Sequence, residues 1–193
     1  MSVDTWVFGY GSLVSPASLS TTIGRNVEAA DVVVAHLHGY GRRWNYGSLH
    51  LRGDWRHGVT DVQQGVVISL GVVPSAEERC NGVAVRVTAD ELAQLDWRER
   101  DYERTDVTDL IVTDRLDADP DLGRRRVVTY VPRASAIERY EAARDAGRAA
   151  IRRSYWDLVG QAFADLGGDH STIYASTPAP DVPVLEMSLS VLG

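Results

Sequence analysis

Short apolar runs rich in valine, separated by glycine-containing turns, fill the first two thirds of the chain and predict a sheet. The predicted strands are residues 5–8, 32–37, 65–72, 82–87, 107–112 and 127–131. Most helical patterns follow them, over residues 136–146 and 149–166. This order predicts an α+β domain around a mixed sheet or small barrel, and not a chain of repeated strand–helix–strand units. A length of 193 residues suits one domain, which we expect to span residues 1–193.

Local signals mark where several helices begin and end. Ser15 precedes a proline and is the predicted N-cap of a helix. Thr88 and Glu91 have the spacing of a capping box and predict the start of another helix. The helix of residues 149–166 should end at the glycine pair that follows it. Residues 171–183 contain three prolines and are expected to be extended.

The charge balance narrows the classes of partner. The formal net charge at pH 7 is −7, which disfavours nucleic acid because phosphate binding needs a basic face. The basic run at residues 124–126 is short and lies near three aspartates, so we interpret it as a solvated strand end. The chain has no lysine, which excludes Schiff-base chemistry and a phosphate-binding-loop lysine.

Cysteine usage and hydropathy point to the cytoplasm. Cys80 is the single cysteine, so the chain can form neither an internal disulfide nor a thiolate zinc site. The first residues show no signal-peptide pattern, and no stretch approaches the roughly 20 apolar residues of a membrane span. We therefore expect a cytoplasmic protein that does not associate with membranes. The sequence carries no signal for oligomeric state.

The loop from Tyr10 to Leu13 lies between a predicted strand and a predicted helix. Its glycines allow a sharp turn and a close approach of the backbone to a ligand. Successive amide N–H groups in such a turn can bind an anion, and a carboxylate or a phosphate would fit. A plain strand-to-helix turn is the alternative. Ser12 does not lie in the G-x-S-x-G pattern of a hydrolase nucleophile, so we interpret it as a binding residue.

Glu99 is the candidate for acid–base chemistry. It lies in a charged run that is flanked by Trp97 and Tyr102, which should cover part of the segment. A carboxylate beside aromatic rings loses water, and its pKa then rises towards the range of a useful general base. The alternative is an ordinary solvated helix end.

Two of the five histidines, His36 and His38, share one face of a predicted strand. Such a pair permits a metal, but a zinc site needs three or four convergent ligands. The sequence marks no further ligand, so no metal site is predicted.

Several segments together resemble the γ-glutamylcyclotransferase superfamily, which includes the ChaC-like and γ-glutamylamine cyclotransferases. They occur in the family's order and cover about residues 5–131, and the helix around residues 155–167 extends the resemblance loosely. The matching segments are VFGYGSL (7–13), GYGRRWN (39–45), NGVAVRV (81–87), LDWRE (95–99) followed by Tyr102, and VTYV (128–131).

The resemblance implies a small mixed β-barrel with surrounding helices and a site at its mouth. It also implies a reaction that closes the γ-glutamyl group of a small substrate into 5-oxoproline and releases the attached amine, without any cofactor. The implied site residues are Glu99 as the catalytic acid/base and, for substrate binding, Tyr10, Gly11, Ser12, Leu13 and Tyr130.

Two alternatives stay open. A binding module would keep the loop and bind γ-glutamyl compounds without turnover, although Glu99 argues against it. A related acyl-transfer enzyme would remove a γ-glutamyl protecting group in secondary metabolism. Glutathione-specific ChaC enzymes carry a Gly-Thr-Pro-Glu stretch where this chain has RGDWRHG (52–58), so the resemblance does not imply glutathione as the substrate.

Overall fold

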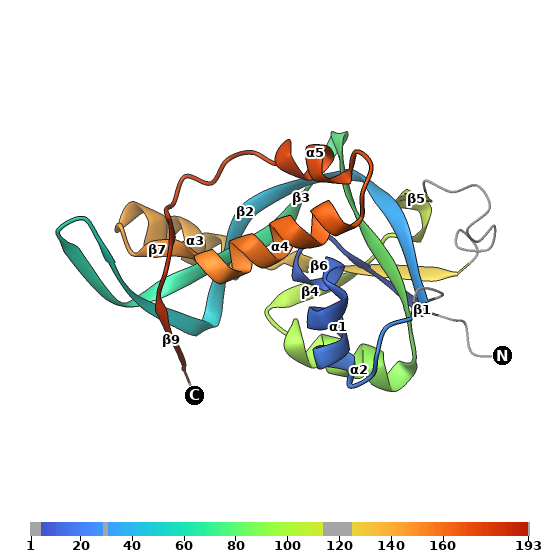
Figure 1. Ribbon diagram of the computed structural model, residues 1–193, viewed down its shortest axis with the longest axis horizontal. Helices are drawn as coiled ribbons and strands as arrows, with labels where there is room; N and C mark the ends of the chain where they lie inside the picture. The colour runs from blue at the N-terminus through green and yellow to red at the C-terminus, as the bar shows by residue number, and fades with distance from the viewer. Residues whose placement is uncertain (1–4, 29–30, 114–124, 193) are drawn as a thin grey trace.

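A long antiparallel hairpin, formed by strands β2 (Val32–His57) and β3 (Thr60–Val87), runs through the computed structural model. The structure describes residues 5–28, 31–113 and 125–192. Figure 1 shows the hairpin extending away from the rest of the chain towards its turn. Four register shifts interrupt the pairing, and such irregularities bend and twist a strand pair. The predicted strands at 32–37, 65–72 and 82–87 are therefore parts of two continuous strands.

The hairpin belongs to a mixed sheet of nine strands within the described residues. Its strand order is β4-β6-β1-β3-β2-β5, with β7, β8 and β9 paired outside this path. β1 lies at the centre, parallel to β6 and antiparallel to β3. The remaining strands are β1 (Thr5–Gly9), β4 (Tyr102–Asp106), β5 (Ile111–Thr113), β6 (Arg126–Pro132), β7 (Ala149–Arg152), β8 (Val184–Leu185) and β9 (Ser188–Val191). The predicted α+β class with a mixed sheet is confirmed.

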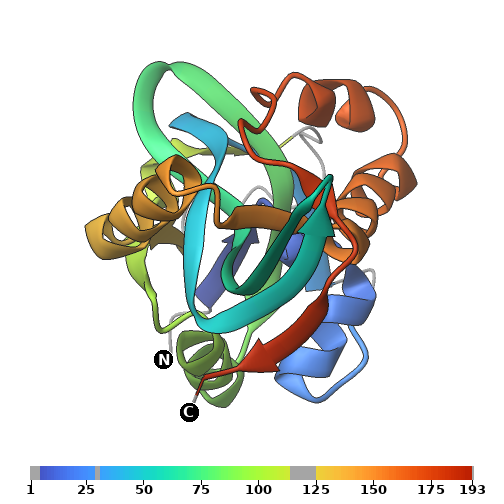
Figure 2. The same cartoon turned by 90° about the vertical axis from the view of Figure 1, so that its left-hand side faces the viewer.

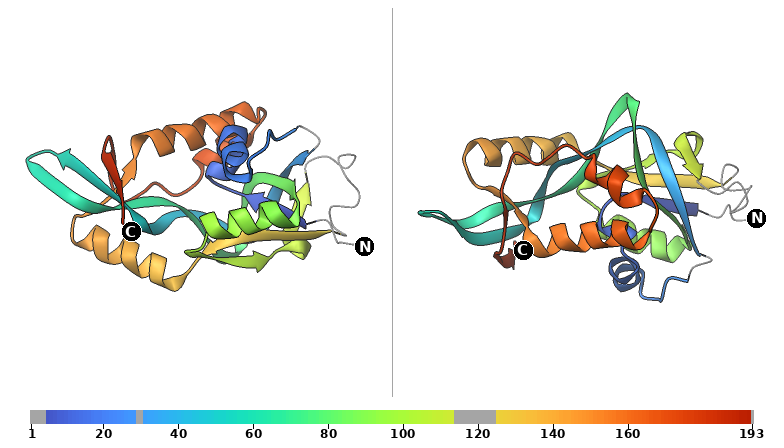
Figure 3. Two further views of the ribbon diagram at one scale, coloured as in Figure 1. Left: turned by 90° about the horizontal axis from the view of Figure 1, so that it is seen from below. Right: turned by 45° about the horizontal axis from the view of Figure 1, so that its top comes forward.

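Five α-helices within the described residues pack around this sheet. α1 and α2 lie against each other, whereas α3 and α4 lie on opposite sides of the hairpin (Figure 3, left). Figure 2 shows β9 alongside the arm of the hairpin, where it pairs antiparallel with residues 51–54 of β2. The helices are α1 (Pro16–Ile23), α2 (Ala89–Arg98), α3 (Ala134–Asp145), α4 (Arg153–Asp165) and α5 (His170–Ala175).

The predicted helix starts are confirmed. The Ser15 hydroxyl caps α1 by accepting a hydrogen bond from the Ser18 amide. At the start of α2, Thr88 and Glu91 form both hydrogen bonds of the capping box. These signals succeed because each depends only on residues three positions apart.

Three predicted elements are wrong in part. Residues 149–152 form β7, because this short apolar segment pairs in parallel with β3 and is buried there. Residues 170–175 form α5, where Tyr174 stacks on Phe163 of α4. The predicted strand at 107–112 begins only at Ile111, after a 3₁₀ turn. Tertiary contacts override local preference in the first two cases.

The core places the end of β1 next to the neighbouring strands and helices. Trp6, Val7 and Phe8 are buried in β1, and Leu19 of α1 and Leu95 of α2 belong to the same apolar cluster. The loop that leaves β1 therefore starts from a rigid base. No helix in the described residues has the length and apolar character needed to cross a membrane. Most of the basic run at 124–126 is described, but Arg124 and its neighbouring aspartates lie outside the described residues.

Candidate functional site

A pocket opens at the end of β1. Its walls come from the loop after β1, the end of α2, strands β3, β4 and β6, and the start of α4. The structure brings all six sequence-predicted site residues into it, whereas their roles remain predictions. The lining residues are Phe8, Gly9, Tyr10, Gly11, Ser12, Leu13, Leu70, Glu99, Tyr102, Tyr130 and Tyr155.

The loop after β1 forms a single 3₁₀ turn, Ser12–Val14, before α1 begins. The amides of Val14 and Ser15 donate to the carbonyls of Gly11 and Ser12, at 3.0 and 3.1 Å. In the part of the chain that the structure describes, the amides of Gly11, Ser12 and Leu13 make no backbone hydrogen bond. Three successive amides on the pocket wall are thus available to an anion.

Gly11 allows a close approach in this loop. A Cβ atom at this position would lie 3.2 Å from the Tyr155 Oη and 3.6 Å from the Leu70 Cβ. Any side chain would therefore press against Tyr155 and displace the loop or the ring. The missing side chain leaves room for the loop to lie this close to Tyr155 and Leu70, and ligand binding by its amides stays a prediction.

Glu99 lies at the C-terminal end of α2, where a tight turn fixes its backbone. Its amide donates to the Leu95 carbonyl, and its carbonyl accepts from the Tyr102 amide, both at 2.8 Å. Only 14% of its side-chain surface is exposed. Burial raises the pKa of the Glu99 carboxyl, and the neighbouring Arg98 opposes that rise. The carboxyl therefore has the raised pKa expected of a general base.

The expectation that Trp97 covers the charged segment is wrong. Trp97 is 72% exposed and stacks on the Arg100 guanidinium outside the pocket. Because the α2 helix turns it outward, the cover over Glu99 comes from tyrosines that are distant in sequence. Tyr102, the other predicted neighbour, does line the pocket.

Three of these tyrosines donate their hydroxyl protons to the protein. Tyr10 donates to the Tyr130 carbonyl at 2.5 Å, and Tyr130 donates to the Asp96 carboxylate at 2.9 Å. Tyr102 donates to the Leu70 carbonyl at 3.2 Å. Tyr10 and Tyr130 can therefore accept hydrogen bonds from a ligand, but in this arrangement neither has a free proton for an oxyanion.

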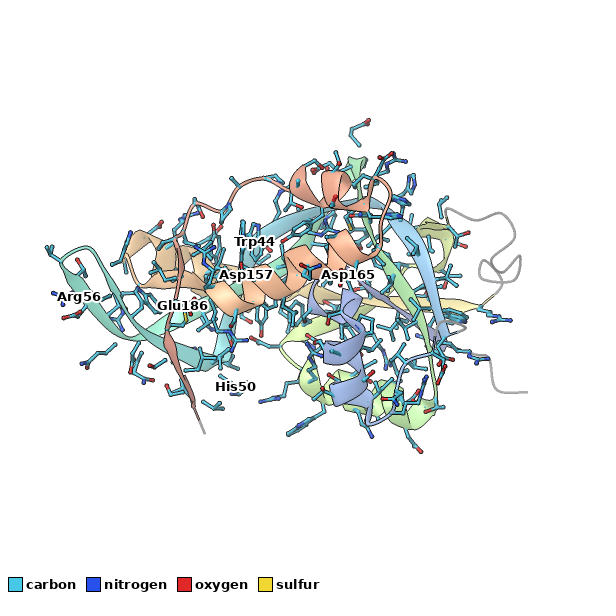
Figure 4. All side chains as sticks on the ribbon, in the orientation of Figure 1. Trp44, His50, Arg56, Asp157, Asp165 and Glu186 are labelled. Carbon is cyan, nitrogen blue, oxygen red and sulfur yellow. The ribbon has the colours of Figure 1, made fainter. Side chains whose placement is uncertain are left out.

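Tyr155 differs from the other three, and sequence reasoning missed it. Its hydroxyl accepts a weak hydrogen bond from the Leu70 amide at 3.5 Å, so its own proton is available. Burial raises the pKa of Tyr155 to about 12, which keeps the hydroxyl protonated at neutral pH. The Trp44 ring packs edge-on against it at 6.2 Å, beside α4 (Figure 4). In the sequence Tyr155 is one of the apolar-face residues of a helix, which gave no sign of a site.

The histidine pair is not part of this pocket. His36 is buried, and its ring centroid lies 6.0 Å from that of His170 on α5. His38 lies one position beyond Leu37, next to a register shift of the hairpin. Across the described ranges, no group of three or more His, Cys, Asp or Glu side chains could hold a metal ion.

Comparisons with known proteins identify the family. The family model described as ChaC-like protein matches residues 5–152, so Tyr155 lies just beyond the matched segment. A search of curated protein sequences gave no match. A yeast γ-glutamyl cyclotransferase specific to glutathione is 15% identical over 91% of this chain and 96% of its own, with a TM-score of 0.57.

Two further solved structures share the fold. A γ-glutamyl cyclotransferase is 12% identical over 92% of this chain and 90% of its own, with a TM-score of 0.54. An uncharacterized human protein is 14% identical over 96% and 94% of the two chains, with a TM-score of 0.57. At such identities the likeness establishes the fold, and the family match adds the type of enzyme. The chain belongs to the ChaC-like protein family of the γ-glutamylcyclotransferase superfamily and is a cyclotransferase-type enzyme.

Proposed function

We propose that this enzyme cyclises the γ-glutamyl group of a γ-glutamyl peptide or amine to 5-oxoproline and releases the attached amine. One observation carries the proposal: the buried carboxylate of Glu99 shares a pocket with a loop whose three amides are available to an anion. A γ-glutamyl group presents an α-carboxylate for the loop and an α-ammonium for the carboxylate.

The loop amides hold the substrate in a folded conformation. The amides of Gly11, Ser12 and Leu13 bind the α-carboxylate, which places the α-nitrogen near the γ-carbonyl carbon. Ring closure within one molecule gains much of its rate from such positioning, up to roughly 7–11 kcal/mol when the geometry is ideal. The phenolic oxygens of Tyr10 and Tyr130 accept hydrogen bonds from the substrate nitrogens.

Glu99 moves the protons. It takes a proton from the α-ammonium, because a protonated amine has no lone pair with which to attack. The free amine then forms the new C–N bond, and the bond between the γ-carbon and the leaving nitrogen breaks. The attacking nitrogen loses two protons overall and the leaving nitrogen gains two, so one carboxyl group can carry them in turn. The raised pKa of Glu99 suits a group that must both accept and return a proton.

Tyr155 stabilises the charge on the γ-carbonyl oxygen. This oxygen becomes an oxyanion while the carbon is tetrahedral, and a donor aimed at it lowers the barrier. The Tyr155 hydroxyl has a proton to donate on the pocket wall. The scheme consists of proton transfers and one acyl transfer, so these side chains and amides supply every group it needs.

The leaving group is the open part of the proposal. Residues 52–58, where the glutathione-specific pattern is missing, lie on the hairpin arm and do not line the pocket. A screen of γ-glutamyl dipeptides, γ-glutamylamines and glutathione, with 5-oxoproline as the readout, identifies the substrate class. Each assay is run with and without EDTA. Release from none of them would contradict the proposed reaction.

The decisive variant is Glu99→Gln, which keeps the size of the side chain and removes the base. General acid–base catalysis contributes about 10²–10⁴-fold, so we expect kcat to fall by roughly a thousandfold with substrate binding retained. Glu103→Gln is the matched control, because Glu103 is exposed on β4. Circular dichroism checks the fold of both variants.

Equal kcat values would remove Glu99 from the reaction and favour a different acyl-transfer chemistry. Binding without turnover in the wild-type protein would favour a binding module.

A further inference from the structure

Arg98 is the last residue of α2, and its side chain contacts both halves of the candidate site. Its Nε lies 3.1 Å from the Glu99 Oε1. Its two terminal nitrogens donate to hydroxyl groups that follow β1, and these three bonds are to Ser12 at 2.8 Å, Thr22 at 2.5 Å and Ser18 at 3.4 Å. One guanidinium thus joins the carboxylate to the loop and to the helix that follows the loop.

The surroundings of Glu99 make this contact electrostatically important. Burial raises the pKa of the Glu99 carboxyl, and the Arg98 charge lowers it. The other titratable groups that interact with Glu99 are tyrosines whose own pKa values are raised, so they are neutral at pH 7. They come from the loop after β1, from β2, β4 and β6, and from α4, and are Tyr10, Tyr46, Tyr102, Tyr130 and Tyr155.

We propose that Arg98 is a positioning residue, which holds the Glu99 carboxylate in place and fixes its location relative to the substrate-binding loop through Ser12. The inference rests on the proposed function of the site. Arg98 lines no part of the pocket wall, so it acts through Glu99 and Ser12 and does not touch the reacting atoms. The Ser12 hydroxyl accepts from Arg98 and keeps its own proton for the ligand.

The planar fork of arginine suits this position. Its donors point in several fixed directions, so one side chain can meet a carboxylate and hydroxyl groups at the same time. Lysine would keep the charge but could not hold all of these partners in one plane. Glutamine would keep an amide donor but lose the charge. These two substitutions therefore separate the electrostatic contribution from the geometric one.

The main test is Arg98→Gln, with two readouts. The first is the pH dependence of kcat/KM for 5-oxoproline release, whose acidic limb reports the ionisation of the free enzyme's base. The second is the titration of the Glu99 carboxyl, followed by carbon NMR in protein labelled at glutamate and without substrate, with Glu99→Gln assigning the signal. We expect both to move to higher pH. We also expect kcat/KM at pH 7 to fall about tenfold to a hundredfold, as for loss of a hydrogen bond to a charged group.

Arg98→Lys and Arg100→Gln complete the experiment. In Arg98→Lys the Glu99 carboxyl should titrate at nearly the wild-type pH, because the positive charge remains. The KM should nevertheless rise, because lysine no longer holds the loop. Arg100 contacts Trp97 on the surface, so Arg100→Gln should leave both readouts unchanged. A folded Arg98→Gln protein with an unmoved Glu99 titration and an unmoved acidic limb would overturn the inference. If Arg98→Gln does not fold, a wild-type KM in Arg98→Lys overturns the link to the loop.

The two readouts keep the inference separate from the proposed function. If the wild type turns over no γ-glutamyl compound, the proposed function fails, and the NMR titration still decides whether Arg98 controls the Glu99 carboxyl. If turnover is present and the titration does not move in Arg98→Gln, the positioning role fails alone.

Discussion

Four tyrosines line the pocket, but their hydroxyl groups are not equivalent. Tyr10, Tyr102 and Tyr130 each donate to a protein acceptor, and the direction of each bond fixes where the proton lies. Tyr155 only accepts, from the Leu70 amide. The proposed oxyanion donor is therefore the residue with the weakest hydrogen bond to the protein.

Tyr155→Phe tests this difference at the level of one oxygen atom. Removal of one oxyanion donor typically costs 10²–10³ in kcat, so we expect a fall of roughly that size with a small change in KM. Tyr140→Phe is the control, because the Tyr140 hydroxyl donates to Asp181 and neither residue lines the pocket. Steady-state kinetics on the best substrate from the screen measures both variants. An unchanged kcat in folded Tyr155→Phe would assign the oxyanion to another donor.

Sequence reasoning identified the residues of the candidate site that local motifs mark and missed those that only the fold brings near. Tyr10, Gly11 and Glu99 stand in short recognisable segments. Arg98 was visible only as one charge in a charged run, and Tyr155 as an apolar-face residue of a helix. Their contacts with Ser12 and Leu70 span 86 and 85 residues, which no local pattern encodes.

In the proposed function, substrate binding depends on the loop after β1. It leaves a buried strand and enters a capped helix, so both of its ends are fixed. Local rules identified this element correctly because a strand end, two glycines and an N-cap follow one another. Local rules failed for β7, where Ala149 and Ala150 favour a helix but pair in parallel with Val66 and Val67.

Gly11→Ala tests whether the close approach of the loop matters. The new Cβ would lie 3.2 Å from the Tyr155 Oη, so the loop amides or the ring must shift. A misplacement of about 1 Å can cost around a hundredfold in rate, and we expect kcat/KM to fall at least tenfold, with a larger loss in Gly11→Val. Ser12→Ala should weaken binding only, since the backbone amides remain.

Gly160→Ala is the matched control for the glycine substitution. Gly160 lies inside α4, and a Cβ there meets no atom within 4 Å. Alanine is the better helix former, by up to about 1 kcal/mol, so this variant should be slightly more stable with unchanged kinetics. Wild-type kinetics in a folded Gly11→Ala protein would show that the loop is a plain turn.

At the scale of the molecule, the pocket depends on the order of the strands in the sheet. β1 lies between β6 and β3, so the loop after it meets Tyr130 on one side and Leu70 on the other. The sequence predicted the mixed sheet because apolar runs and turns are local features. It did not predict the single long hairpin, since the pairing between β2 and β3 shifts register four times along its length.

The burial of Glu99 also has a consequence for the stability of the whole fold. Burial raises the pKa of Glu99, so the folded protein binds this proton more tightly than the unfolded chain does. The free energy of unfolding therefore loses a contribution as pH rises from the ordinary glutamate pKa of 4.5 through the raised value. Glu99→Gln removes this loss, so the Tm of the variant minus that of the wild type should increase between pH 4 and pH 8.

Glu91→Gln provides a control of opposite sign. Burial raises the pKa of Glu91, but hydrogen bonds from Arg25 and from the Thr88 amide outweigh burial and leave it lowered. Its carboxylate therefore stabilises the fold above pH 4.5, and this contribution is lost as pH falls through the lowered pKa. Glu91→Gln should lower Tm at neutral pH and have less effect in acid. Calorimetry across pH measures the Tm of both variants. A Tm difference between Glu99→Gln and the wild type that does not change with pH would contradict a buried ionised carboxylate. If Glu99→Gln is both more stable and less active than the wild type, the Glu99 carboxylate lowers stability and is needed for the chemistry.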